Sequence, residues 1–167
     1  MGTQIKDADD VSFPTDESAL ASIYLAQEGR TQHICARAQD AFQLVGRCHF
    51  IAGSEVSLTH AAFLEGPPLP EGTATFLLPR FGAKLSAEEI RALPKDIDWR
   101  KTVKSDEAEI RRSLDTNFGP HVVLVPSGFL FTSGSYEQLR RFLLEHAGLH
   151  TVVDLPSGVL QLSLIHI

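Results

Sequence analysis

The sequence is poor in the residues that build disulfide frameworks and metal clusters. It has only two cysteines among 167 residues, Cys35 and Cys48, and they are too far apart for a Cys-x-x-Cys motif. We expect both to be buried free thiols in a reducing compartment, which makes the cytoplasm the expected location. The seven histidines are scattered along the chain, so no zinc site is expected.

Long apolar runs and an excess of positive charge are also missing. No apolar stretch approaches the length of a membrane span, and the polar, acidic first residues do not resemble a secretory signal. The net charge of −6 argues against a chain that coats DNA by electrostatics alone. Acidic residues are interleaved with the basic residues Arg91, Lys95, Arg100, Lys101 and Lys104. We therefore favour a solvated mixed-charge loop over a basic patch in this segment.

Residues 121–159 carry the clearest structural prediction. Residues 121–125 are apolar and rich in β-branched side chains, as in a buried strand. Ser135–His146 is predicted to be a helix, because four apolar residues recur at helical spacing: Tyr136, Leu139, Phe142 and Leu143. Gly148 is a helix stop signal, and residues 151–155 are predicted to be a second strand. This order implies a right-handed crossover between strands of one sheet.

The remainder of the chain also alternates between strand and helix patterns. Residues 19–26 fit either a helix or, at residues 22–26, a strand. Strands are expected at residues 11–13, 55–59 and 73–78, and helices at residues 31–47, 86–93 and 105–114. Such alternation indicates an α/β fold with a doubly wound, Rossmann-like sheet.

Three segments resemble the motifs of a known protein family. The sequences VLVPSGFLF, LRRFLLE and VVDLPSGV, in this order between residues 121 and 159, resemble the catalytic domain of adenine-N6 DNA methyltransferases. The similarity is greatest to the modification subunit of type I restriction–modification systems. This resemblance implies an incomplete class I methyltransferase sheet, S-adenosylmethionine as cofactor, and DNA and the specificity and restriction subunits as partners. An unrelated α/β protein with two Pro-Ser-Gly turns is the alternative.

The resemblance extends to one half of a cofactor site. Residues 23–28, IYLAQE, are similar to the family's strand that ends in Gly-Gln-Glu, which implies that Glu28 binds the ribose of S-adenosylmethionine. A carboxylate suits this role because it accepts two hydrogen bonds. A surface glutamate after a strand is the alternative. The family's Gly-x-Gly turn has no counterpart, because its nearest candidate, residues 11–18, contains no glycine.

The catalytic motif of the family is altered as well. Family members place Asn/Asp-Pro-Pro-Tyr/Phe after a strand, where polar oxygens accept hydrogen bonds from the adenine amino group and the ring stacks on the flipped base. In the corresponding segment here, Pro79 and Phe81 match the motif and are the candidate catalytic residues. Leu78 replaces the Asn or Asp, and Arg80 replaces the second proline. Leucine cannot accept a hydrogen bond, so we predict that this site does not methylate.

These observations divide the chain into three parts. Residues 1–10 are expected to be a disordered lead-in, residues 11–161 a partial methyltransferase-like domain, and residues 162–167 a non-native tail. A genuine terminal strand is the alternative for the tail. The expected function is that of an inactive fragment of an adenine-N6 DNA methyltransferase. The alternatives are a pseudo-methyltransferase that binds DNA or a partner in a defence complex, and an unrelated nucleotide-binding α/β domain, disfavoured by the missing glycine loop.

Overall fold

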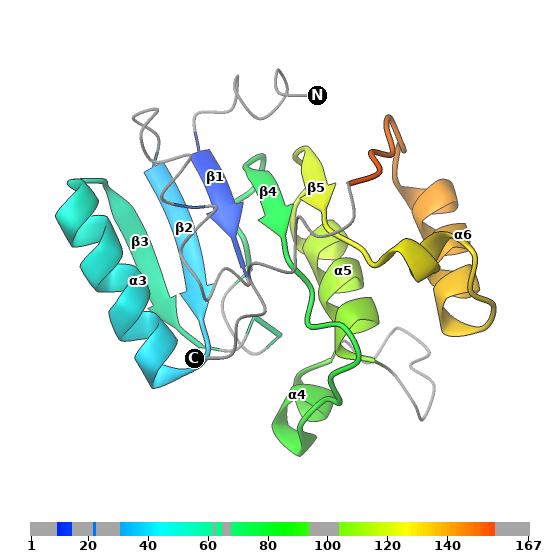
Figure 1. The fold of residues 1–167 in the computed structure, drawn as a ribbon, viewed down its shortest axis with the longest axis horizontal. Coiled ribbons are helices and arrows are strands. Elements are labelled where there is room, and N and C mark those ends of the chain that lie inside the picture. The colour runs from blue at the N-terminus through cyan, green and yellow to red at the C-terminus, as the bar shows by residue number, and fades with distance from the viewer. Residues whose placement is uncertain are drawn as a thin grey trace. The chain divides into compact units, whose positions relative to one another are not determined.

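Five parallel strands form the central sheet of a computed structural model, which describes residues 10–14, 22, 31–61, 63–64, 68–93 and 104–155 (Figure 1). The strands are β1 (Asp10–Phe13), β2 (Thr31–Ala36), β3 (Val56–His60), β4 (Ala74–Leu77) and β5 (His121–Val123). The chain divides into two compact units, Met1–Pro126 and Ser127–Ile167, and the whole sheet belongs to the first.

The strand order is β3-β2-β1-β4-β5, and all four pairings are parallel. The order reverses between β1 and β4, which defines the switch point of a doubly wound sheet. The α/β class and the Rossmann-like sheet expected from the sequence are therefore confirmed.

Helices cover both faces of this sheet. Ile34 of β2 lies in a buried apolar cluster with Val45 of the helix α3 (Gln39–Ala52). The next residue, Cys35, lies close enough to Arg112 of the helix α5 (Ser105–Thr116) to interact electrostatically. Because successive side chains of a strand point to opposite faces, α3 and α5 cover opposite faces of the sheet. Each fully buried aliphatic side chain in these layers stabilises the fold by roughly 1.5–3 kcal/mol.

One expected helix is wrong in its first part. Residues 31–47 are predicted to be helical, but Thr31–Ala36 forms β2 and the helix begins only at Gln39. β2 is paired on both sides, with β1 and β3, and is buried on both faces. A strand buried on both faces shows no polar–apolar alternation, so its residues also fit a helical period. The helix ends at Gly53, which has a left-handed φ of 65°.

The other elements of the first unit lie close to their predicted positions. β3 and β4 agree with the prediction within one residue at each end, and the predicted helix at residues 105–114 is α5. The helix α4 (Ala87–Ala92) starts after Ser86, whose side chain forms a capping box with Glu89. In the described ranges no helix combines the length and apolar character that a membrane crossing requires.

The second unit contains a 3-10 turn, η1 (Ser127–Leu130), and the helix α6 (Ser135–His146). α6 has both of its predicted ends. Leu139 is fully buried, and the rings of Phe129 and Tyr136 pack with their centroids 5.4 Å apart. The guanidinium of Arg140 donates hydrogen bonds to the carbonyl oxygens of Phe129 and Thr132, which ties η1 to α6.

The predicted strand at residues 151–155 is wrong. These residues have no regular secondary structure and all five are exposed. In the described part of the chain no strand pairs with them, and an apolar β-branched segment forms a strand only where a partner satisfies its backbone. The predicted crossover between two strands is therefore not formed by these residues.

Asn117, which follows α5, holds the start of β4 in place. Its Nδ2 donates to the Thr73 carbonyl oxygen at 2.6 Å and to Thr75 Oγ1 at 2.8 Å. Its Oδ1 accepts from the backbone N–H groups of Gly72 at 3.0 Å and Gly119 at 2.9 Å. A Cβ atom on Gly119 would lie 2.2 Å from the Thr73 carbonyl oxygen, so only glycine fits there.

We expect Asn117→Ala to lower the free energy of unfolding by about 2–4 kcal/mol, because it leaves buried backbone groups without partners. Gly119→Ala should destabilise the protein as well, through the clash with Thr73. Urea unfolding followed by circular dichroism measures both effects. Gly46→Ala is the matched control, since its added Cβ meets only the end of the Leu58 side chain at 3.4 Å. A loss for Asn117→Ala no larger than the control's would contradict this role.

Candidate functional site

The candidate site lies at the carboxyl ends of β2 and β4. In doubly wound sheets, ligands bind outside the carboxyl ends of the strands, next to the switch point. Arg37 directly follows β2, and residues 78–81 directly follow β4. In Figure 1 this edge is marked by the arrowheads of β1, β2 and β4.

The chain leaves β4 in a tight turn that contains both candidate catalytic residues. Pro79 is buried, whereas the side chain of Phe81 is 37% exposed. The N–H of Phe81 donates to the Pro79 carbonyl oxygen at 3.0 Å, and Gly82 continues the turn with a φ of 73°. The structure therefore places Pro79 and Phe81 at the carboxyl end of β4, and their catalytic role stays a prediction.

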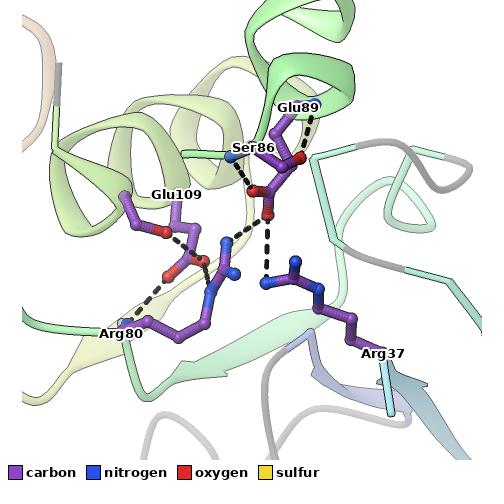
Figure 2. Close-up of polar contacts among 6 residues, drawn as sticks. Arg37, Arg80, Ser86, Glu89 and Glu109 are labelled. Carbon is purple, nitrogen blue, oxygen red and sulfur yellow. Dashed lines mark hydrogen bonds and ion pairs between the residues drawn. The ribbon is translucent and has the colours of Figure 1, made fainter. Parts of the chain in front are cut away.

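Arg80 is the centre of an ion-pair cluster with two buried carboxylates. Its Nε donates to Glu109 Oε1 at 2.5 Å, and its second terminal nitrogen donates to Glu89 Oε1 at 2.6 Å (Figure 2). Its backbone N–H also donates to Glu109 Oε2, at 2.9 Å. Both carboxylates are fully buried, while Arg80 keeps 23% of its side chain exposed. One arginine thus links the end of β4 to both α4 and α5.

Three further residues complete what we call the Arg80 cluster. Ser105 Oγ donates to Glu109 Oε1 at 3.0 Å, and the Ser86 N–H donates to Glu89 Oε2 at 2.7 Å. Arg37 approaches Glu89 Oε1 from the end of β2, at 3.7 Å. Its side chain is 47% exposed. The Arg80 cluster is therefore Arg37, Arg80, Ser86, Glu89, Ser105 and Glu109 (Figure 2).

The two carboxyl groups of the cluster have opposite pKa shifts. Burial alone would raise the pKa of Glu89, but the Ser86 N–H and the guanidinium groups of Arg80 and Arg37 outweigh it and lower that pKa. Burial dominates at Glu109 and raises its pKa, although Arg80 and Ser105 partly offset the effect. Burial alone would lower the pKa of Arg80, but its two carboxylate partners outweigh burial and raise that pKa above its ordinary value.

The acidic members of the cluster are not identified by the sequence analysis. Glu89 lies three residues after Ser86, and the capping box that this spacing allows is a feature of a helix start and not of a functional site. Glu109 lies one helical turn after Ser105, with which it pairs, but that spacing is common on exposed helices. Only the packing of α5 against β4 shows that Glu109 is buried.

Glu28, the predicted ribose-binding residue, lies outside the described residues, so its role stays a prediction. Residues 23–28, which resemble the family's strand, lie outside the described residues. The strand that leads directly into α3 is β2. Arg37 is consequently the residue that follows that strand. Of the segment 11–18, the structure describes β1 and Pro14 and not the residues after them.

Comparison with known proteins supports the fold and leaves the activity open. The structure is similar to a crystal structure of a candidate class I S-adenosylmethionine-dependent methyltransferase from Listeria monocytogenes, with a TM-score of 0.69 and 13% sequence identity. The match covers 85% of this chain and 47% of that chain, so this chain spans about half the length of its structural relative. The chain has the class I methyltransferase fold. No protein-family model matches its sequence, and no curated protein matches it.

The described residues do not form a complete site for S-adenosylmethionine. The ribose hydroxyl groups require a hydrogen-bond acceptor near the end of the second strand. Arg37 occupies that position, and a guanidinium only donates. The two carboxylates of the Arg80 cluster, Glu89 and Glu109, are fully buried and engaged with Arg80. Within the described part of the chain, no His, Cys, Asp or Glu residues gather as they would around a metal ion.

We expect Arg80→Ala to lower the free energy of unfolding by about 3–5 kcal/mol, because it leaves two buried carboxylates without their cation. Arg80→Lys should give an intermediate loss, since lysine keeps the charge and lacks the planar fork. Urea unfolding measures both. Arg47→Ala, at an exposed position on α3, is the control and should change stability by no more than about 0.5 kcal/mol. Equal losses for Arg80→Ala and Arg47→Ala would show that the cluster is not structural.

The raised pKa of Glu109 predicts a pH dependence with a definite sign. The folded protein binds this proton more tightly than the unfolded chain, so the stabilisation is present below the ordinary value of 4.5 and is lost as pH rises through the raised pKa. Wild type should therefore lose stability relative to Glu109→Gln as pH rises from 4.5 towards neutrality. Unfolding curves across this pH range test it, with the exposed Glu88→Gln as control. A difference that stays constant or grows in favour of wild type would contradict it.

Proposed function

We propose that the chain is part of an adenine-N6 DNA methyltransferase, of the type I modification-subunit kind, and that it does not transfer methyl groups by itself. Two independent observations support the family. The class I methyltransferase fold comes from the structure, and the resemblance of residues 121–159 comes from the sequence. The fold alone is compatible with many methyl acceptors, so the choice of adenine in DNA rests on the sequence resemblance.

The bonding of Arg80 to buried carboxylates is the observation that best supports the proposed loss of activity. Methylation of adenine requires acceptors that orient the exocyclic amino group of the flipped base. Leu78 offers no acceptor in its side chain. Arg80, in place of the second proline, donates through its backbone N–H and its guanidinium to buried carboxylates. The residue at the second-proline position of the motif is thus engaged in a structural ion pair.

The proposed cofactor and partners follow from the same family. S-adenosylmethionine would supply the methyl group, with Glu28 as the proposed ribose-binding residue, and we expect weak cofactor binding because the Gly-x-Gly turn is missing. DNA and the specificity and restriction subunits are the proposed partners. The cytoplasm, where such a complex meets its DNA, is the proposed location.

The Arg80 cluster also favours a second candidate, a pseudo-methyltransferase that serves as a DNA- or partner-binding subunit. An arginine that merely replaced the second proline of a disused motif would be expected to point into solvent. Arg80 is instead part of a network with two fully buried partners from α4 and α5. Such integration is expected when the fold is retained for binding after the chemistry has been lost.

We expect no transfer of radiolabelled methyl groups from S-adenosylmethionine to unmethylated DNA by the wild-type protein. Leu78→Asn alone should not create activity, because Arg80 still occupies the position of the second proline. Arg80→Pro should unfold the protein more readily, since proline removes both the guanidinium and the backbone donor to Glu109. Leu78→Ala is the control for a change at this position that adds no hydrogen-bond acceptor. Label in the DNA with wild type would refute the proposed loss of activity.

Fluorescence anisotropy with a labelled DNA duplex separates the two candidates. The pseudo-methyltransferase predicts DNA binding by this chain alone, with a dissociation constant that S-adenosylmethionine leaves unchanged. The modification-subunit proposal predicts DNA binding only when the specificity subunit is added.

A further inference from the structure

We propose that two copies of this chain form a dimer through the outer edge of β3 and the adjoining flank of α3, related by a twofold axis. The partner is therefore a second copy of the same chain. The inference does not depend on the proposed function, because no residue of the Arg80 cluster lies on β3 or α3.

The outer edge of β3 is open to another strand. β3 is the last strand of the sheet, and among the described residues it pairs only with β2 (Figure 1). Proteins commonly protect such an edge with charged side chains or proline. Val56–His60 has the sequence VSLTH, with no lysine, arginine, carboxylate or proline. This unprotected edge can pair with its own copy in antiparallel register, centred on Leu58.

A row of three residues on α3 borders this edge. Phe42, Gly46 and Phe50 recur at a spacing of four, so they lie on one flank of the helix. The flank faces β3, because the ring centroids of Phe42 and His60 are 5.1 Å apart and a Cβ on Gly46 would meet the Leu58 side chain at 3.4 Å. Phe50, at the end of the row, is 87% exposed. An apolar ring is thus left in solvent beside the open strand.

The charged side chains of α3 lie away from this row. Asp40 comes two residues before Phe42, and Arg47 comes one residue after Gly46. At 3.6 residues per turn, both point roughly 100–120° away from the centre of the row. A copy of the helix that packs on this flank therefore meets no like charge in the seam. Depletion of charged residues is typical of the core of an interface.

A single twofold axis satisfies both the strand and the helix. Leu58 is the centre of β3, Gly46 is the centre of the row, and the two residues lie against each other. An axis perpendicular to the sheet beside Leu58 pairs β3 with its copy. The same axis places Phe42 of one copy opposite Phe50 of the other, with the two Gly46 residues between them. The surface is therefore self-complementary, as a twofold interface requires.

The spacing of the two helices fits as well. α3 packs over both β2 and β3, so its axis lies about half a strand spacing inside β3. The twofold axis lies half a spacing outside β3. With neighbouring strands about 4.7–4.9 Å apart, the two copies of α3 are then roughly 9–10 Å apart. Packed helices have interaxial distances of about 8–10 Å, so the helices meet without a clash.

The expected area requires both elements. A specific interface buries about 1,200–2,000 Å² in total. The two exposed Phe50 side chains supply roughly 300–400 Å², a quarter to a third of the lower limit. The paired edges of β3 and the rest of the α3 flank must supply the remainder. Loss of either element should therefore break the dimer.

Sedimentation velocity of the full chain tests the proposal. We expect wild type to be a dimer at about 10–100 µM, as an interface at the low end of the standard size provides. Phe50→Glu should raise the dissociation constant at least about tenfold, because it puts a charge into the apolar seam. Ile51→Glu is the matched control, since Ile51 is 83% exposed but lies on the other flank of α3, and it should leave the dimer intact. Circular dichroism confirms that both variants are folded.

Amide hydrogen exchange tests the strand pairing separately. The backbone N–H groups on the outer edge of β3 should exchange more slowly above the dissociation constant than below it. Four results would overturn the inference. They are a monomeric wild type throughout this concentration range, a dimer that Phe50→Glu leaves intact, a dimer that Ile51→Glu weakens equally, and exchange in β3 that does not depend on protein concentration.

Discussion

The ion pair between Arg80 and the two buried glutamates is the interaction on which this edge of the protein depends. Arg80 lies in the turn after β4, Glu89 lies on α4 and Glu109 lies on α5. A single guanidinium therefore joins three elements. Two carboxylates without solvent contact would be very unfavourable if that cation were removed. The course of the chain after β4, which carries Pro79 and Phe81, is therefore constrained by an interaction beneath it.

This constraint acts at the edge of the sheet that contains the switch point. The five-stranded sheet has the class I methyltransferase fold, and its switch point is where a ligand would bind. The groups after β2 and β4 nevertheless include two guanidinium groups and the apolar side chain of Leu78, and the two carboxylates that pair with Arg80 are fully buried.

The sequence predicts the fold well where amphipathic periods are strong, and less well where burial is complete. α6 has both of its predicted ends because one face of it is apolar. Thr31–Ala36 is mistaken for a helix because a strand buried on both faces has no alternation, and residues 151–155 lack the partner that a strand needs. The location of Pro79 and Phe81 is predicted, but the burial of Glu109 depends on packing that the local sequence does not encode.

The central claim, that Arg80 is a structural cation bonded to two buried carboxylates, can be tested by NMR. The measurement is the rate at which the Nε–H proton of Arg80 exchanges with water. Because this proton is hydrogen-bonded to Glu109, it should exchange far more slowly than that of Arg141, whose side chain is 72% exposed. The protection should disappear in Glu109→Ala. An Arg80 proton that exchanges as fast as that of Arg141 in wild type would contradict the account.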